Sequence, residues 1–234
     1  MSLAALPLLD QAVLVLAAMA LFSAFALLAQ SRLLAAIHVF AWQGLLVAAV
    51  AALMGAASGD VNLYVSAAIT LALKVLLIPW MLHRLLRRLA LERQADPLAH
   101  PALTLLAAAA IVVFADWVAA PVAQFEHSAT RNVIAISLAV VLLGLLMMVV
   151  RRQALAQVLG FMAMENGLLL AAVASTHGMP LVVELGVAFD VLVAMVLFGV
   201  FFLQIKDSID SLDVDRLSQL SASIEQDEEP EPRP

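Results

Sequence analysis

Long apolar runs separated by short polar turns dominate the chain, and seven of these runs reach the length that crosses a bilayer. A hydrocarbon core about 30 Å thick needs about 20 apolar residues in a helix. The backbone must satisfy its own hydrogen bonds in lipid, so each run is predicted to be helical. The pattern therefore predicts an all-α, polytopic membrane protein with seven transmembrane helices. The runs cover residues 5–29, 33–57, 61–83, 102–123, 132–150, 154–175 and 179–205.

Basic residues gather in alternate loops, and this bias predicts the orientation of the chain. Seven spans place the basic loops and the start of the C-terminal tail on one side, where Lys and Arg mark the cytoplasm. The loops on the other side hold a single basic residue, Arg131. We therefore expect an outside N-terminus and a cytoplasmic C-terminus. The basic residues on the predicted cytoplasmic side are Arg32, Arg84, Arg87, Arg88, Arg93, Arg151, Arg152 and Lys206.

Two similar segments indicate an internal repeat. Residues 43–51 read QGLLVAAVA and residues 166–174 read NGLLLAAVA, and each lies in a helix that follows a short basic turn. The pattern predicts two three-helix copies, 5–83 and 132–206, joined by a connector helix over 102–123. An odd number of connecting helices keeps the copies in the same orientation, so the repeat is predicted to be parallel. The alternative is a chance match between Leu/Ala/Val-rich helices.

After residue 206 the character of the chain changes. Residues 207–224 space their apolar positions by three and four, which favours a short amphipathic helix. Its polar face is acidic, which disfavours anionic lipid and favours a protein partner. The last ten residues, EQDEEPEPRP, have the acidic, Pro-rich composition of disordered segments. We therefore divide the chain into a membrane bundle, 1–206, and an acidic cytoplasmic tail, 207–234.

Composition narrows the class of function. The 234 residues are 65% hydrophobic and 13% charged, against about 45–50% apolar residues in soluble domains. The chain has no cysteine, which excludes disulfides, thiolate metal sites and iron–sulfur clusters of its own. No metal-ligand spacing, nucleophile motif or phosphate-binding loop occurs. We therefore expect no cofactor, no metal and no independent catalysis, and no basic surface for nucleic acid.

The candidate chemistry lies in charged residues inside the apolar runs, since a carboxylate at bilayer depth costs about 2.5–3.5 kcal/mol on insertion scales. We expect Glu165, Asp190 and Lys74 near the middle of their runs, at one depth, with Glu184 nearer the outer surface. Acids and a lysine in one layer can pass protons if water fills the gaps between them. The layer therefore predicts a lateral proton or ion path. The supporting polar residues are Gln43, Asn166 and His38.

A structural interpretation of the same residues stays open. Lys74 can neutralise Glu165 or Asp190 as a fixed ion pair between helices, since paired charges cost less than single ones in a membrane. Gln43 and Asn166 are of the type that makes hydrogen bonds between helices. For His38 a polar contact near the cytoplasmic end of its helix is favoured over proton relay.

The chain resembles component E of the hydrogenase-4 and formate hydrogenlyase group. The resemblance covers residues 5–220, and the segments that carry it are LYVSAAITLALKVLLIP, MENGLLLAAV, ELGVAFDVLVAMVLFGVFF and KDSIDSLDVDRL. In that family the last three helices are similar to the K-type small subunit of complex I and to the C subunit of multisubunit cation/proton antiporters. The resemblance implies a membrane-arm subunit beside large antiporter-like subunits, holding no redox centre.

The resemblance transfers to residues unevenly. The K-type pattern G-L-E-x-M-x-N aligns with residues 160–166, where its glutamate position is Met162 and the acid present is Glu165. Glu165 is three residues after Met162 and therefore lies on nearly the same helix face. The resemblance thus implies that Glu165 takes the role of the K-type glutamate. Asp190 corresponds to a glutamate of the third K-type helix. Lys74 resembles the lysines of the large antiporter-like subunits.

The expected function is therefore that of an inner-membrane subunit of a hydrogenase-4-like redox complex, which contributes to a proton or ion path between its neighbours. Its expected partners are antiporter-like and other membrane subunits, and the lipid bilayer. Two alternatives remain: an assembly scaffold of that complex, and a C-subunit-like component of a cation/proton antiporter.

Overall fold

The part of the chain that the structure describes consists mainly of six long apolar helical spans. The structure is a computed structural model and describes residues 7–88, 100–121 and 128–176, together with residues 186, 191–193, 195, 196 and 199. Each of the six helical spans in these ranges is long and apolar enough to cross a membrane. The all-α, polytopic membrane fold that the hydrophobic pattern predicts is confirmed for this part. The seventh predicted run and the tail lie outside the described residues except for these few positions.

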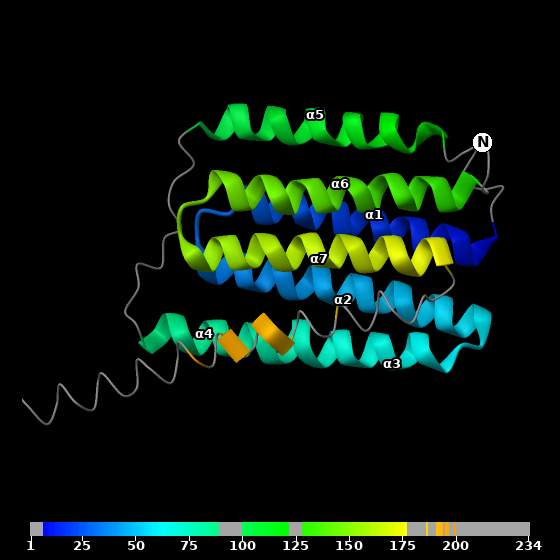
Figure 1. The fold of residues 1–234 in the computed structure, drawn as a ribbon, viewed down its shortest axis with the longest axis horizontal. Coiled ribbons are helices and arrows are strands. Elements are labelled where there is room, and N and C mark those ends of the chain that lie inside the picture. Colours follow the sequence, from blue (N-terminus) through cyan, green and yellow to red (C-terminus); the bar gives the residue numbers. More distant parts are fainter. Residues whose placement is uncertain are drawn as a thin grey trace, which may run out of the picture. The chain divides into compact units, whose positions relative to one another are not determined.

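The described helices begin and end close to the predicted boundaries. The third span is one continuous rod (Figure 1) made of α3, a π-helical segment η2 and α4. It extends to Arg88, beyond the predicted end at residue 83, because arginines favour helix and can reach an interface with their long side chains. The elements are α1 (Leu8–Ala29), α2 (Leu33–Ser58), α3 (Val61–Thr70), η2 (Leu71–Leu77), α4 (Ile78–Arg88), α5 (Pro101–Ala119), α6 (Ser128–Val150) and α7 (Ala154–Thr176).

Local sequence signals explain the turn between α2 and α3. Gly59 closes α2 in the left-handed region, at φ 70°, and donates its N–H to the carbonyl of Gly55. A glycine adopts this conformation without the penalty that a Cβ brings. Asp60 then caps α3, because its side chain accepts a hydrogen bond from the N–H of Asn62 at 2.9 Å.

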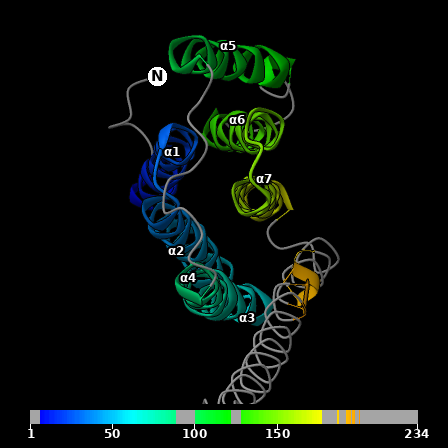
Figure 2. The same ribbon diagram turned by 90° about the vertical axis from the view of Figure 1, so that its left-hand side faces the viewer.

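The helices of residues 1–192, which form one compact unit, pack in two neighbouring rows. Viewed along the helix axes (Figure 2), α5, α6 and α7 form one row, and α1, α2 and the α3–α4 span form the other. α1 packs on α6, and α2 packs on α7. In both pairs the two helices run in the same direction (Figure 1). This is the arrangement that a parallel repeat would produce. The second unit, residues 193–234, contributes only isolated helical positions to the description.

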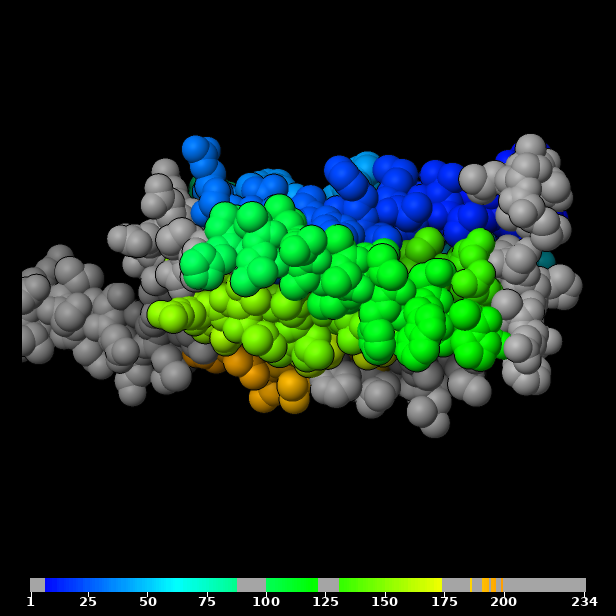
Figure 3. All heavy atoms as spheres, turned by 90° about the horizontal axis from the view of Figure 1, so that it is seen from above, coloured from blue at the N-terminus to red at the C-terminus, as the bar shows by residue number. Residues whose placement is uncertain are grey.

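α5, the predicted connector, lies at the edge of the first row. Seen from its side (Figure 3), its atoms lie in front of the others. It packs on α6 and leaves most of its large apolar side chains exposed, including Leu106, Val113 and Trp117. An apolar surface of this extent faces lipid or a partner subunit in a membrane protein.

Glycines allow the closest approach between helices, that of α6 and α7. A Cβ added at Gly144 would lie 2.6 Å from the nitrogen of Met164 and 2.7 Å from the carbonyl oxygen of Gly160. A Cβ at Gly167 would lie 2.8 Å from the backbone of Val141. Helices inside lipid have no hydrophobic driving force toward one another. Small residues stabilise their association instead, because they allow the backbones to pack closely.

Replacing Gly144 with alanine is therefore expected to destabilise the α6–α7 pair by about 1–3 kcal/mol, because the added carbon has no room. Gly199→Ala is the control, since a Cβ at Gly199 meets no atom within 4 Å. The thermal unfolding midpoint of the purified chain in detergent measures the effect. Equal midpoints for the two variants would contradict the packing described.

Arg151 has a structural role that its place in a basic turn does not reveal. Arg151 and Arg152 both belong to the basic residues predicted on the cytoplasmic side, yet Arg151 is buried while Arg152 is exposed. Its Nη2 donates to the carbonyl oxygens of Leu28, at 2.8 Å, and Gln30. These carbonyls lie at the C-terminal end of α1, where helix carbonyls lack partners within the helix and the dipole favours a cation.

Arg151→Gln is expected to cost about 1–3 kcal/mol, because it leaves buried carbonyl oxygens of α1 without their charged donor. The neighbouring substitution Arg152→Gln removes the same charge from an exposed position and is expected to change stability by no more than about 0.5 kcal/mol. Thermal unfolding of both purified variants gives the comparison. The assignment fails if Arg152→Gln destabilises the chain as much as Arg151→Gln.

Candidate functional site: a buried polar layer

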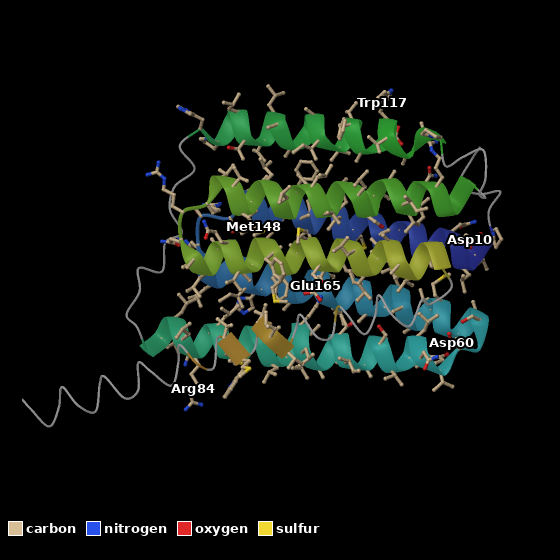
Figure 4. The ribbon with its side chains drawn as sticks, viewed as in Figure 1. Asp10, Asp60, Arg84, Trp117, Met148 and Glu165 are labelled. Carbon is tan, nitrogen blue, oxygen red and sulfur yellow. The ribbon has the colours of Figure 1, made fainter. Side chains whose placement is uncertain are left out.

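An ion pair lies buried between two helices from different halves of the chain. Nζ of Lys74, on η2, is 3.3 Å from Oε1 of Glu165, on α7, and the two side chains are 1% and 6% exposed. Glu165 lies about halfway along its helix (Figure 4). The separation is longer than the ~2.7–2.9 Å of a short charge-assisted hydrogen bond. The contact is therefore an ion pair without a short hydrogen bond between the two atoms.

Two amides extend this pair into a layer. Nδ2 of Asn166, next to Glu165 on α7, donates to Oε1 of Gln43 on α2 at 3.3 Å. Nε2 of Gln43 donates in turn to the carbonyl oxygen of Ala20 on α1 at 3.2 Å. Gln43 and Asn166 are both fully buried. The layer thus links η2, α7, α2 and α1 at one level of the bundle.

The two amides occupy equivalent positions in the two similar sequence segments. Gln43 opens QGLLVAAVA and Asn166 opens NGLLLAAVA. Their hydrogen bond therefore joins the two proposed copies at matching positions, as expected where related helices meet about a local symmetry axis. One acceptor of the layer, Oδ1 of Asn166, is buried and accepts no hydrogen bond from the described residues. Buried acceptors of this kind usually bind ordered water.

Lys74 lies in the middle of a π-helical segment, and Pro79 gives the physical reason for that segment. Proline has no N–H to donate to the carbonyl four residues earlier, and its ring crowds that carbonyl. The ladder shifts just before it: the N–H of Ile78 donates to the carbonyl of Leu73, five residues back. Such π-turns interrupt a helix locally and are frequent at functional sites.

Two glycines make room around the pair. A Cβ at Gly44, the residue after Gln43, would lie 3.2 Å from Cβ of Lys74, so this glycine lets η2 approach α2. A Cβ at Gly186 would lie 3.3 Å from Oε1 of Glu165. Gly186 itself therefore lies beside the Glu165 carboxylate.

The structure brings together four of the residues singled out in the sequence and leaves one apart. Lys74, Glu165, Gln43 and Asn166 form the layer described above. His38 is exposed nearer the beginning of α2, and its Nδ1 bonds to the carbonyl oxygen of Leu34 at 2.7 Å, the local polar contact favoured for it. The remaining two candidates, Glu184 and Asp190, lie outside the described residues.

Sequence reasoning missed the residues that shape the layer and extend it. Gly44 and Gly186 look like ordinary glycines in apolar runs. The available signal for Gly44 is that it follows Gln43, as Gly167 follows Asn166 in the second similar segment. Ser66 and Thr70 are buried on α3, about two turns and one turn before Lys74, respectively. Their four-residue spacing to Lys74 is the available signal, because side chains four apart share a helix face.

Comparisons with known proteins identify the family. The chain is 35% identical to the uncharacterized protein Rv0085 of Mycobacterium tuberculosis over 187 residues, covering 80% of this chain and 85% of that protein. It is 29% identical over 181 residues to hydrogenase-4 component E of Escherichia coli K12, covering 77% of this chain and 84% of that protein. The chain belongs to the hydrogenase-4 component E family. Hydrogenase-4 component E of Shigella flexneri matches equally well. No family model matches the chain, and neither does a solved structure.

Membership of this family agrees with the resemblance found in the sequence, and the predicted family is confirmed. The match spans most of both chains. The chain is a multi-pass membrane protein of that family. The roles of individual residues in the polar layer do not follow from family membership and rest on their geometry.

Gly44→Ala is expected to weaken the coupling between Lys74 and Glu165, because the methyl group pushes η2 away from α2. Gly55→Ala is the matched control: its Cβ also meets a neighbour at 3.2 Å, Leu63, but three turns from the pair. Double-mutant cycles of Lys74→Met and Glu165→Gln in each background give the coupling energy. We expect it to fall by roughly half with Gly44→Ala and to persist with Gly55→Ala. Equal coupling energies would remove the positioning role of Gly44.

Proposed function

We propose that this chain is a membrane subunit of a hydrogenase-4-like complex, and that its buried polar layer passes protons or ions between neighbouring subunits. The single observation that carries the second part is the Lys74–Glu165 pair, buried halfway along the bundle beside a π-turn. Intramembrane ionisable groups are rare and usually mark ion pathways or proton relays. The first part rests on the family relationship with hydrogenase-4 component E.

The proposed step is an exchange of partners. When Glu165 takes up a proton, its attraction for the Lys74 ammonium is lost, and Lys74 is released toward another acceptor. When Glu165 loses the proton, the pair forms again. The π-turn supports this movement because its hydrogen bonds are less regular than those of an α-helix. In this proposal Asp190 and Glu184 continue the path along the seventh run, and the acceptor Oδ1 of Asn166 holds a bridging water.

A second function, that of an assembly scaffold, is favoured by one observation: the pair joins the two halves of the chain directly. Buried ion pairs fix how helices meet, and removing one partner costs about 3–5 kcal/mol because the other charge stays buried. On this interpretation Lys74 and Glu165 never separate. The two functions predict different results when both charges are removed together.

The orientation, the repeat and the tail complete the proposal. The labelled acids Asp10 and Asp60 lie at one end of the bundle and Arg84 lies toward the other (Figure 4), which supports an outside N-terminus in the inner membrane. The parallel pairs α1–α6 and α2–α7 support two three-helix copies, 5–83 and 132–206, joined by the connector. For the tail, 207–234, we propose contact with a cytoplasmic subunit, and for the bundle contact with antiporter-like subunits.

Proton translocation by the assembled complex separates the two functions. Glu165→Gln is expected to lower recovery of the complex, since Lys74 stays charged without this partner. Lys74→Met with Glu165→Met is expected to restore recovery, because neither charge remains buried. The path then predicts fewer protons moved per electron than in the wild type, because the proton-transfer groups are gone. The scaffold function predicts that the double variant moves as many protons per electron as the wild type.

The control is Asp116→Asn, which breaks the exposed Asp116–Arg131 pair at 3.2 Å and is expected to leave both readouts unchanged. Asp190→Asn in the same assay tests the acid of the seventh run. A wild-type number of protons moved per electron in the Lys74→Met/Glu165→Met variant would contradict the path proposal. Purification of the tagged chain from its native membranes tests the complex: hydrogenase subunits should copurify, and recovery of antiporter subunits alone would contradict a hydrogenase-like assembly.

A further inference from the structure

A groove opens where η2 and α4 lie against α2. Its volume is about 710 Å³, and its walls are almost entirely apolar. Two imidazoles interrupt the apolar lining, those of His38 on α2 and His83 on α4. The other described residues along the groove are Ile37, Ala41, Ala72, Val75, Leu76, Leu77, Pro79 and Trp80.

The groove matches the depth of one lipid leaflet. It extends along the third span from Ala72 to His83, about 16 Å at the rise of a helix. Half of a hydrocarbon core is about 15 Å. The apolar end begins beside the π-turn, and the imidazole of His83 lies toward the end of α4 that carries the arginines. A transmembrane helix would span the whole thickness, whereas an acyl chain ends at half of it.

Positive charge stands at the polar end of the groove. Arg84 and Arg87 are exposed on α4, one and four residues after His83. The guanidinium of Arg84 lies 5.3 Å from the ring centre of Trp80, which lines the groove and is half exposed. Figure 4 shows Arg84 pointing away from the bundle. Tryptophan and arginine at this level mark the interface between hydrocarbon and headgroups.

We propose that this groove is a binding site for an anionic phospholipid, with an acyl chain between α2 and η2 and the phosphate held by His83, Arg84 and Arg87. Basic pockets between helices on the cytoplasmic side are the sites at which anionic headgroups bind, and the arginine bias predicts that this end is cytoplasmic. Charge complementarity selects an anionic over a zwitterionic lipid. The acyl chain packs against η2, so the lipid supports the segment that carries the ion pair.

Native mass spectrometry of the full chain in detergent tests the proposal with two probes, dioleoylphosphatidylglycerol and dioleoylphosphatidylcholine. The wild-type chain should retain phosphatidylglycerol preferentially. Arg84→Gln and Arg87→Gln should each weaken that retention about fivefold, the contribution of one basic residue near a surface. Phosphatidylcholine retention should stay unchanged in both. Arg152→Gln, an exposed arginine at the same predicted side but outside the groove, should leave retention of both lipids at the wild-type level.

Substitutions that fill the groove test the binding of the acyl chain separately from the binding of the headgroup. Ala72→Leu adds bulk at an exposed lining position and should release phosphatidylglycerol while the thermal unfolding midpoint stays within error. Ala41→Trp is the second filling variant should Ala72→Leu fold poorly. Equal losses with Arg84→Gln and Arg152→Gln would overturn the proposal, as would full retention in a folded filling variant. A cysteine at position 72 that cross-links to another subunit in the assembled complex would show a protein occupant and overturn it as well.

Discussion

The need to keep Lys74 and Glu165 away from lipid organises much of what surrounds them. A single buried charge is costly in a membrane, and a pair is acceptable only where geometry brings the two groups together. The bundle meets this need with helices that come from distant parts of the sequence. Because η2 supplies the lysine and α7 supplies the glutamate, the two halves of the chain depend on each other at this level.

The close contacts around the pair follow from the same constraint. Gly44 lets the backbone of η2 reach α2, and Pro79 explains why the helix is π-helical where Lys74 leaves it. The amides of Gln43 and Asn166 then satisfy polar groups at the same depth. Glycines between α6 and α7 hold the glutamate-bearing helix against its neighbour. Each of these features is local, yet each acts on the position of one ion pair.

The third span takes part in both features. Lys74 of η2 pairs with Glu165, and other residues of η2 line the apolar groove, which has basic residues at its end. A π-turn between two such environments can respond to either one, because its hydrogen bonds tolerate adjustment. Lipid occupancy and the protonation of Glu165 would therefore act on the same seven residues. This coupling gives the two proposals a common structural element while each keeps its own test.

Hydropathy and the positions of the charged residues were enough to predict the helices and the candidate site residues. Backbone hydrogen bonding in lipid leaves no alternative to helix for a 20-residue apolar run, so the six described spans followed from hydropathy alone. The insertion cost of charge likewise singled out Lys74 and Glu165. The pairing of these two residues is seen only in the folded chain, as are the hydrogen bond between Asn166 and Gln43 and the contact of Arg151 with the end of α1. Such pairings depend on which helices become neighbours and on how they are rotated, and apolar helices with similar composition on every face carry almost no sequence record of either.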